Sequence, residues 1–467
     1  MSLTLRATQL VLSLVLTFCA LAANAAVEIQ IYDTATDGDD YVCWAPVHAR
    51  ARLSAPANAS TSIQLTSEST PGAGTVMFVA DKDQKPHPSD LIAEKTLALT
   101  LSGDQGWTGF YILGWRSSKG EKDVRIMARD GTGQVLGQQA VMVRVRKDAE
   151  SLTTQERDIF LKAIAQLHDL SNGGLATQWN KHARAHADAF QFGIHGTPLF
   201  GPWHRAFLLG LERELQRIDP RVAIPYWRFD KPAPHVFHPS FLGRVNDAQT
   251  PGAFLVDFDS ANPLFGWQVF DGRGGMTRST NGDSTGPIDV TAFDALLMRF
   301  PYSVFNDQLE FAYHNTAHRV IGGWLGSAGS PRDPLFYLLH ANVDRAWAHW
   351  QLKHGRFNVA GNDGDSYPLL GSYPGPAVVD RARKGSYLQD GMWPWVAGAN
   401  QGTPDPNDDW PGFSYQFISA LPLVGPVTPP TPGSMLDYLD TAGAGASDGF
   451  CYDDMHFNGK DPRTFGN

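Results

Sequence analysis

Histidines are unevenly distributed along this chain of 467 residues, and their positions restrict how it can fold. Twelve of the 15 lie between positions 168 and 354. His182 with His186, and His314 with His318, are four residues apart, a spacing that puts both rings on one face of a helix, one turn apart. Copper and zinc are bound by several converging neutral imidazoles. The middle of the chain is therefore predicted to be a helical region built around a metal site.

The histidines nearer the C-terminus form the clearer cluster. His314 and His318 have the spacing of the zinc-binding helix of metalloproteases, but that motif requires Glu directly after the first His, where this chain has Asn315. A metalloprotease site is thus disfavoured. Asp333-Pro334 is typical of a helix start, with Asp as the N-cap and Pro in the first turn. His340 follows two turns inside that helix.

A second cluster lies upstream. Pro202 is expected to open a helix with His204 in its first turn, and His195 to lie on the preceding loop. His182 and His186 share the helix before that loop, and by spacing alone either ring of this pair can face the site. Because no carboxylate ligand accompanies these histidines, copper is favoured over a di-iron centre, which uses Glu and Glu-x-x-His sets.

Both clusters resemble the copper motifs of the tyrosinase family. Pro202-Trp203-His204-Arg205, followed by Glu212–Leu215 and Pro225–Trp227, is similar to the first motif. The stretch Leu309–Trp350 is similar to the second, with His-Asn-x-x-His, Asp-Pro-x-Phe, a third His and Val-Asp-Arg-x-Trp in that order. The resemblance spans residues 155–355. It implies a type-3 dicopper centre, held by a four-helix bundle in a mainly α catalytic domain.

The resemblance also implies which imidazoles bind copper. His186 is preferred to His182 as the first ligand because Trp179 stands seven residues before His186, as an aromatic residue does in the family. His182 remains the alternative. The implied ligands are His186, His195 and His204 for the first copper, and His314, His318 and His340 for the second.

Glu310 and Asn315 are the predicted catalytic residues. Glu310 lies four residues before His314, and in similar enzymes a Glu at this position orients a water that helps to deprotonate a monophenol. Asn315 follows the first ligand, as it does in enzymes able to hydroxylate monophenols. The alternative is a surface carboxylate and a helix-interior amide. We prefer the catalytic interpretation because a carboxylate beside a dicopper centre is placed to act as a base.

The resemblance implies an oxidoreductase with two copper ions and O2 as co-substrate. It would hydroxylate monophenols and/or oxidise o-diphenols to o-quinones, with small phenols as substrates and a copper-delivery protein as a partner. One alternative is a catechol or o-aminophenol oxidase without monophenolase activity. Another is a hemocyanin-like O2 carrier, which would use the same histidines but exclude phenols. The small residues Gly322-Gly323 and Gly326-Ser327-Ala328-Gly329 suggest an open mouth, which favours the oxidase.

The N-terminal part has a different pattern. Short apolar or alternating runs, such as Val27–Tyr32, Val47–Leu53 and Val124–Ala128, are separated by turn residues. This pattern is typical of an immunoglobulin-like β-sandwich. We expect an all-β accessory domain over residues 26–150, the dicopper domain over 151–454, and a C-terminal tail over 455–467.

The first 25 residues resemble a signal peptide. Arg6 precedes the apolar run Leu10–Ala23, which is shorter than the roughly 20 residues that span a bilayer, and Ala23-Asn24-Ala25 fits a cleavage site. We therefore expect a secreted or periplasmic protein, with a disulfide between Cys43 and Cys451. The net charge of −10 without a long basic run argues against nucleic acid or an anionic membrane as a partner.

Overall fold

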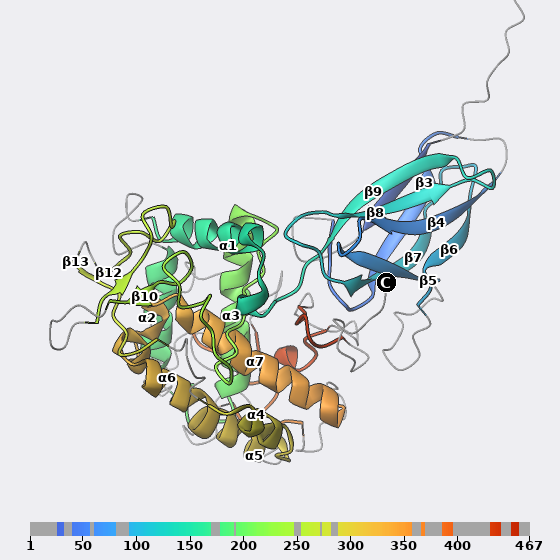
Figure 1. Ribbon diagram of the computed structural model, residues 1–467. Coiled ribbons are helices and arrows are strands. Elements are labelled where there is room, and N and C mark those ends of the chain that lie inside the picture. The colour runs from blue at the N-terminus through green and yellow to red at the C-terminus, as the bar shows by residue number, and fades with distance from the viewer. Residues whose placement is uncertain are drawn as a thin grey trace, which may run out of the picture.

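The structure is a computed structural model (Figure 1). It describes residues 26–31, 40–56, 60–80, 93–169, 178–190, 193–246, 254–270, 273–281, 288–356, 366–368, 385–395, 430–439 and 450–456. The predicted signal peptide and almost all of the predicted tail lie outside the described residues. No helix in the described part of the chain combines the length and the apolar character that crossing a bilayer requires.

The N-terminal part is β-rich, as predicted. Its described strands form a four-stranded sheet in the order β1-β3-β7-β5 and a five-stranded sheet in the order β2-β9-β8-β4-β6, and the two sheets lie against each other (Figure 1). The strands are β1 (Val27–Ile31), β2 (Tyr41–Val42), β3 (Val47–Leu53), β4 (Thr61–Ser69), β5 (Thr75–Ala80), β6 (Thr96–Leu101), β7 (Thr108–Arg116), β8 (Val124–Arg129) and β9 (Val135–Val143). Within these sheets the pairs are antiparallel except β2 with β9.

Alternation of side chains explains how the two sheets share a core. In β3 the side chains of Ala49, Ala51 and Leu53 are fully buried, while Arg50 and Arg52 between them point outward. Successive residues of a strand face opposite sides of the sheet, so a strict two-residue pattern buries one face and leaves the other hydrated. The alternating runs of the sequence are the direct cause of this arrangement.

A mainly helical part follows. Its helices are α1 (Thr154–Leu167), α2 (Gln178–Phe190), α3 (Phe200–Ile218), α4 (Val290–Leu297), α5 (Tyr302–Asp307), α6 (Asn315–Ile321) and α7 (Leu335–His354). A π-helical turn, η5 (Gln308–His314), joins α5 to α6, and short 3-10 turns are η2 (Ala149–Ser151), η6 (Gly323–Gly326), η7 (Ser330–Arg332) and η9 (Gly433–Met435). Two small antiparallel pairs, β10 (Arg244–Val245) with β11 (Val256–Asp257) and β12 (Gln268–Phe270) with β13 (Arg273–Gly275), lie beside the helices.

Local sequence signals set most helix boundaries. Thr153 and Glu156 form a reciprocal capping box at the start of α1. Helix α7 starts one residue later than predicted, with Pro334 rather than Asp333 at the N-cap, although the carboxylate of Asp333 accepts the N–H of Leu335 at 2.9 Å. The helix ends at Gly355 in the left-handed conformation. Helix α3, however, begins at Phe200 rather than at Pro202, which leaves His204 in its second turn.

A buried ion network joins the β-rich part to the helices. Arg146, which follows β9, contacts Glu212 of α3 at 2.7 Å and Asp344 of α7 at 3.1 Å. Asp344 also binds Arg205 of α3 at 2.6 Å. All four side chains are almost completely buried. Two cations therefore balance two anions in the interior, which offsets the cost of removing each charge from water.

The C-terminal segment 450–456 closes the same interface. Cys451 forms the predicted disulfide with Cys43, which lies just after β2. The next residue, Tyr452, donates its hydroxyl to Asp344 at 2.5 Å and accepts the indole N–H of Trp44 at its backbone carbonyl. Asp454 pairs with Arg345 of α7. The segment 450–456 thus links the β-rich part to the helical core.

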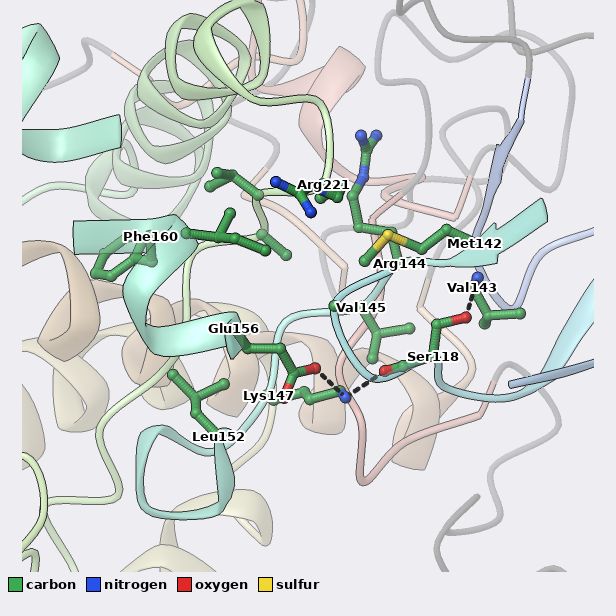
Figure 2. Close-up of a pocket in the computed structure, with 14 residues that line it drawn as sticks. Ser118, Met142, Val143, Arg144, Val145, Lys147, Leu152, Glu156, Phe160 and Arg221 are labelled. Carbon is green, nitrogen blue, oxygen red and sulfur yellow. Dashed lines mark hydrogen bonds and ion pairs between the residues drawn. The ribbon is translucent and has the colours of Figure 1, made fainter. Parts of the chain in front are cut away.

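Near this interface, a shallow hollow lies where the β-rich part meets α1 (Figure 2). Lys147 crosses it, donating to the carbonyl of Ser118 at 2.5 Å and pairing with Glu156. The side chain therefore connects the loop after β7 to the capping box of α1. None of the predicted site residues lines this hollow.

The substitution Arg146→Met is expected to destabilise the protein by about 3–5 kcal/mol, because it leaves Glu212 and Asp344 buried with only one cation between them. The measurement is the free energy of unfolding from a urea titration. Arg52→Met is the matched control, since Arg52 pairs with Glu28 at the surface and a surface ion pair contributes only about 0–1 kcal/mol. Equal losses in the two variants would contradict the role assigned to the buried network.

Candidate metal centre

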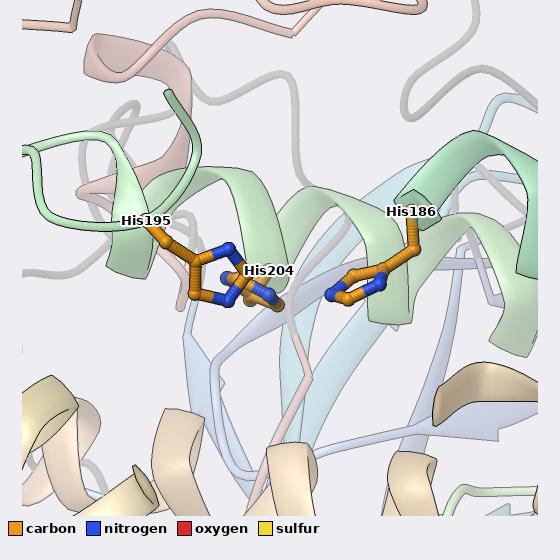
Figure 3. Close-up of side chains that lie close together, drawn as sticks. All are labelled: His186, His195 and His204. Atoms are coloured by element: carbon orange, nitrogen blue, oxygen red, sulfur yellow. The ribbon is translucent and has the colours of Figure 1, made fainter. Parts of the chain in front are cut away.

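Six imidazoles gather among α2, α3, α6 and α7. They form two groups of three, and within each group one nitrogen from every ring lies within 4.8 Å of the other two. Among the described residues, these two groups have the geometry to hold a metal ion. The first group is His186 from α2, His195 from the α2–α3 loop and His204 from α3, whose rings converge in Figure 3. The second group is His314 at the end of η5, His318 from α6 and His340 from α7.

Backbone carbonyls orient half of these rings. The Nδ1 atoms of His186, His204 and His318 lie 2.9, 2.8 and 2.6 Å from the carbonyl oxygens of Ala328, Phe200 and Leu325 respectively. A carbonyl can only accept a hydrogen bond, so each Nδ1 must carry the proton. The Nε2 lone pair then remains available to a metal, which is the usual way a protein sets the tautomer of a ligating histidine.

The two groups face each other at close range. The rings of His204 and His340 stack with centroids 4.3 Å apart and planes 8° apart. Within the second group, Nε2 of His340 lies 3.2 Å from Nε2 of His314 and 3.3 Å from Nε2 of His318. Nε2 of His318 holds a lone pair, so without a metal it can accept a hydrogen bond from Nε2–H of His340, and with a metal it can act as a ligand atom.

Burial keeps all six rings neutral. Desolvation lowers the pKa of each imidazole, to about 3 for His186, about 4 for His318, and well below its usual value for the other four. At neutral pH protons therefore do not compete for the ligand atoms. Nε2 of His186 and of His204 has no hydrogen-bond partner, although both atoms are buried. Buried, neutral imidazole nitrogens without carboxylates fit copper.

His182 is placed apart from these groups. Its ring packs beside Phe207, with centroids 5.5 Å apart, and it belongs to neither histidine group. The structure thus brings His186, rather than the alternative His182, together with His195 and His204. Other histidines outside the two groups have structural contacts: for example, Nε2 of His168 lies 2.7 Å from the Gln268 carbonyl.

Glu310 is buried beside the loop of the first group. Its side chain is in η5, and both carboxylate oxygens accept the backbone N–H of Gly196, at 2.8 and 2.9 Å. Burial raises the pKa of Glu310 to about 7. The four-residue spacing of Glu310 and His314 predicts one turn of α-helix between them, but the segment is π-helical. Its contact with Gly196, next to His195, was therefore missed.

Asn315 starts α6 directly after His314 and is half-buried.

The interpretation of Gly322-Gly323 as an open mouth is wrong. A Cβ on Gly323 would lie 2.0 Å from the carbonyl oxygen of Thr277, and one on Gly322 would lie 2.3 Å from Oγ of Ser279. Both glycines also have a positive φ, 62° for Gly322 and 58° for Gly323. They are required for close backbone packing and a tight turn after α6.

Comparisons with known proteins agree with this geometry. A model of the common central domain of tyrosinase matches residues 162–353. The tyrosinase of Streptomyces glaucescens is 31% identical over 272 residues, which cover 54% of this chain and 92% of that protein. The chain belongs to the tyrosinase family. The chain is also 30% identical to hemocyanin 1 of Megathura crenulata over 226 residues, which cover 44% of this chain but 6% of that protein. A polyphenol oxidase structure from Thermothelomyces thermophila aligns with a TM-score of 0.43 and 20% identity, over 66% of this chain and 88% of that chain.

In this member of the family, His204→Ala should remove copper from the first group while the second group retains its own, because one of three converging nitrogens is lost. Copper per folded chain is the measurement. His182→Ala is the matched control, since His182 is equally buried on the neighbouring helix but lies outside both groups. Equal copper loss in the control would contradict the ligand assignment.

Proposed function

We propose that this protein is a type-3 copper oxidase that uses O2 to hydroxylate monophenols and/or to oxidise o-diphenols to o-quinones. The observation that carries the proposal is the pair of neutral, buried histidine groups, which face each other across the stacked rings of His204 and His340. One copper ion would be bound by His186, His195 and His204, and a second by His314, His318 and His340. When bound, the two reduced copper ions supply the pair of electrons that O2 accepts.

The protein itself supplies position and access. Carbonyls hold the rings of His186, His204 and His318, so three ligand atoms are oriented before a metal arrives. As whole residues, four of the six histidines are buried, whereas His195 and His318 are partly exposed. A phenol would therefore reach the centre from the side of His195 and His318.

Glu310 and Asn315 would handle the phenolic proton. A monophenol loses its hydroxyl proton before its oxygen can bind a metal strongly, and Glu310 is a buried carboxylate fixed beside the loop of His195. With Asn315 next to His314, it would orient a water that receives this proton. The double contact with Gly196 gives Glu310 a further role, because it fixes the residue after His195.

An O2 carrier is the second candidate, favoured by the 30% identity to hemocyanin 1 over 226 residues. It requires the centre to be closed to phenols. The partial exposure of His195 and His318 favours the oxidase instead. A catechol or o-aminophenol oxidase would have the same centre but would lack the hydroxylation of monophenols.

We also infer the domain organisation, the localisation and the partners of the protein. Residues 26–150 would be an immunoglobulin-like sandwich, and residues 151–454 a catalytic domain in which α2, α3, α6 and α7 form the four-helix bundle. Two facing, mainly antiparallel sheets support the first assignment. Residues 1–25 would direct secretion to the periplasm or the cell exterior, which agrees with the disulfide between Cys43 and Cys451. A copper-delivery protein would load the centre, and no nucleic-acid or membrane partner is inferred.

The decisive experiment is O2 uptake by the copper-loaded protein beginning at Ala26, first with a catechol and then with the matched monophenol. Uptake with both would establish a tyrosinase activity, and uptake with the catechol alone would establish a catechol oxidase. A protein that binds two coppers and consumes no O2 with either substrate would contradict the oxidase and favour the carrier.

Glu310→Gln should lower kcat/KM for the monophenol by about 10²- to 10⁴-fold, the usual contribution of a general base, and affect catechol oxidation much less. Asn315→Ala should shift the ratio of the two rates in the same direction. Glu68→Gln, at an exposed carboxylate in β4 that pairs with Arg129, is the isosteric control. Equal losses of kcat/KM on both substrates would mean that Glu310 supports the loop of His195 through Gly196 and does not act on the phenolic proton.

A further inference from the structure

The partly exposed imidazoles identify the open side of the centre. As whole residues, four of the six histidines are buried, and His195 in the first group and His318 in the second are partly exposed. Whatever surrounds these two rings will touch the part of a phenol that projects out of the site.

Two large aromatic side chains flank His195. Phe190, the last residue of α2, is 46% exposed, and its ring centroid lies 4.7 Å from that of His195. Phe311 in η5 is 55% exposed, and its Cζ lies 3.8 Å from where a Cβ would stand on Gly196, the residue after His195. Both rings thus lie at the one partly exposed ligand of the first group.

Phe311 faces outward although its neighbour Glu310 is buried. Glu310 is 2% exposed and accepts the N–H of Gly196, whereas Phe311 is turned to the surface beside the same glycine. A single π-turn inserted in a helix shifts side chains around the axis, and such turns recur at functional sites. Single exposed apolar residues are ordinary, but two aromatic rings beside the same ligand make a local apolar rim at the entrance.

We propose that Phe190 and Phe311 form an aromatic rim that binds the substituent opposite the phenolic oxygen, so that the enzyme prefers phenols with an apolar extension to compact ones. This inference rests on the proposed function and names the substrate class of that site. With the phenolic oxygen directed at the centre, the para position points outward toward the entrance. An alkyl or aryl group there gains contact with both rings and leaves water.

The test compares 4-tert-butylcatechol with 4-methylcatechol, which differ only in the size of the apolar group. In Phe311→Ala we expect the preference for the tert-butyl compound, measured as the ratio of kcat/KM values, to fall by about 3- to 10-fold, through KM rather than kcat. Phe190→Leu should lower it less, because part of the apolar contact remains. Val135→Ala, at an exposed apolar residue of β9, is the control and should leave the ratio unchanged.

Binding without turnover separates this inference from the proposed function. Under nitrogen, 4-tert-butylphenol and 4-methylphenol are titrated into the copper-loaded protein, and their Kd values are compared in the wild type and in Phe311→Ala. A wild-type preference that Phe311→Ala removes supports the rim even if O2 uptake shows no oxidation. Oxidation of both catechols with a ratio of Kd values unchanged by Phe311→Ala would overturn the rim and leave the oxidase intact. Copper content, measured for every variant, shows whether Phe190 instead acts by supporting His195.

Discussion

The structure depends on one buried carboxylate, that of Asp344. It accepts contacts from Arg146 of the β-rich part, Arg205 of α3 and the hydroxyl of Tyr452 near the C-terminus. Arg205 follows His204, and Asp344 lies one turn beyond His340, so this contact fixes the two helices whose histidine rings stack across the metal centre. A charge so deeply buried is tolerated only when its partners are in place. The contacts of Asp344 therefore fix α3, α7, the β-rich part and the segment 450–456 relative to one another.

A single loop orients one ring in each histidine group. The chain after α6 passes through η6, where Leu325 accepts from His318, and then reaches Ala328, which accepts from His186. Gly323 permits this path because its backbone lies against Thr277 with no room for a side chain. The two histidine groups are thus not independent of each other. A change in this loop would rotate one imidazole of each group together.

Much of this centre could be predicted from local spacing, because helical periodicity is a local property. Pairs of histidines four apart and the Asp-Pro start of α7 indicate His314, His318 and His340, and leave His186 and His182 as alternatives. The choice of His186, and the assignment of His195 and His204, came from the resemblance to the tyrosinase family. The rest depends on contacts between distant segments. The pairing of Arg146 with residues 66 and 198 positions away has no local signal. The glycines after α6 likewise have their role set by a distant segment, since Gly323 lies against the backbone of Thr277 and Gly322 against the side chain of Ser279.

The attachment of the β-rich part bears on whether it shields the centre. It is joined to the helical part twice by covalent bonds, through the chain after β9 and through the disulfide between Cys43 and Cys451. Cutting the first connection alone would leave it attached. In Figure 1 its strands lie on the far side of the helical part from α2 and α6, which carry His186 and His318. In this view the described strands do not cover these helices, and the contacts of Arg146 with Glu212 and Asp344 anchor the β-rich part to α3 and α7.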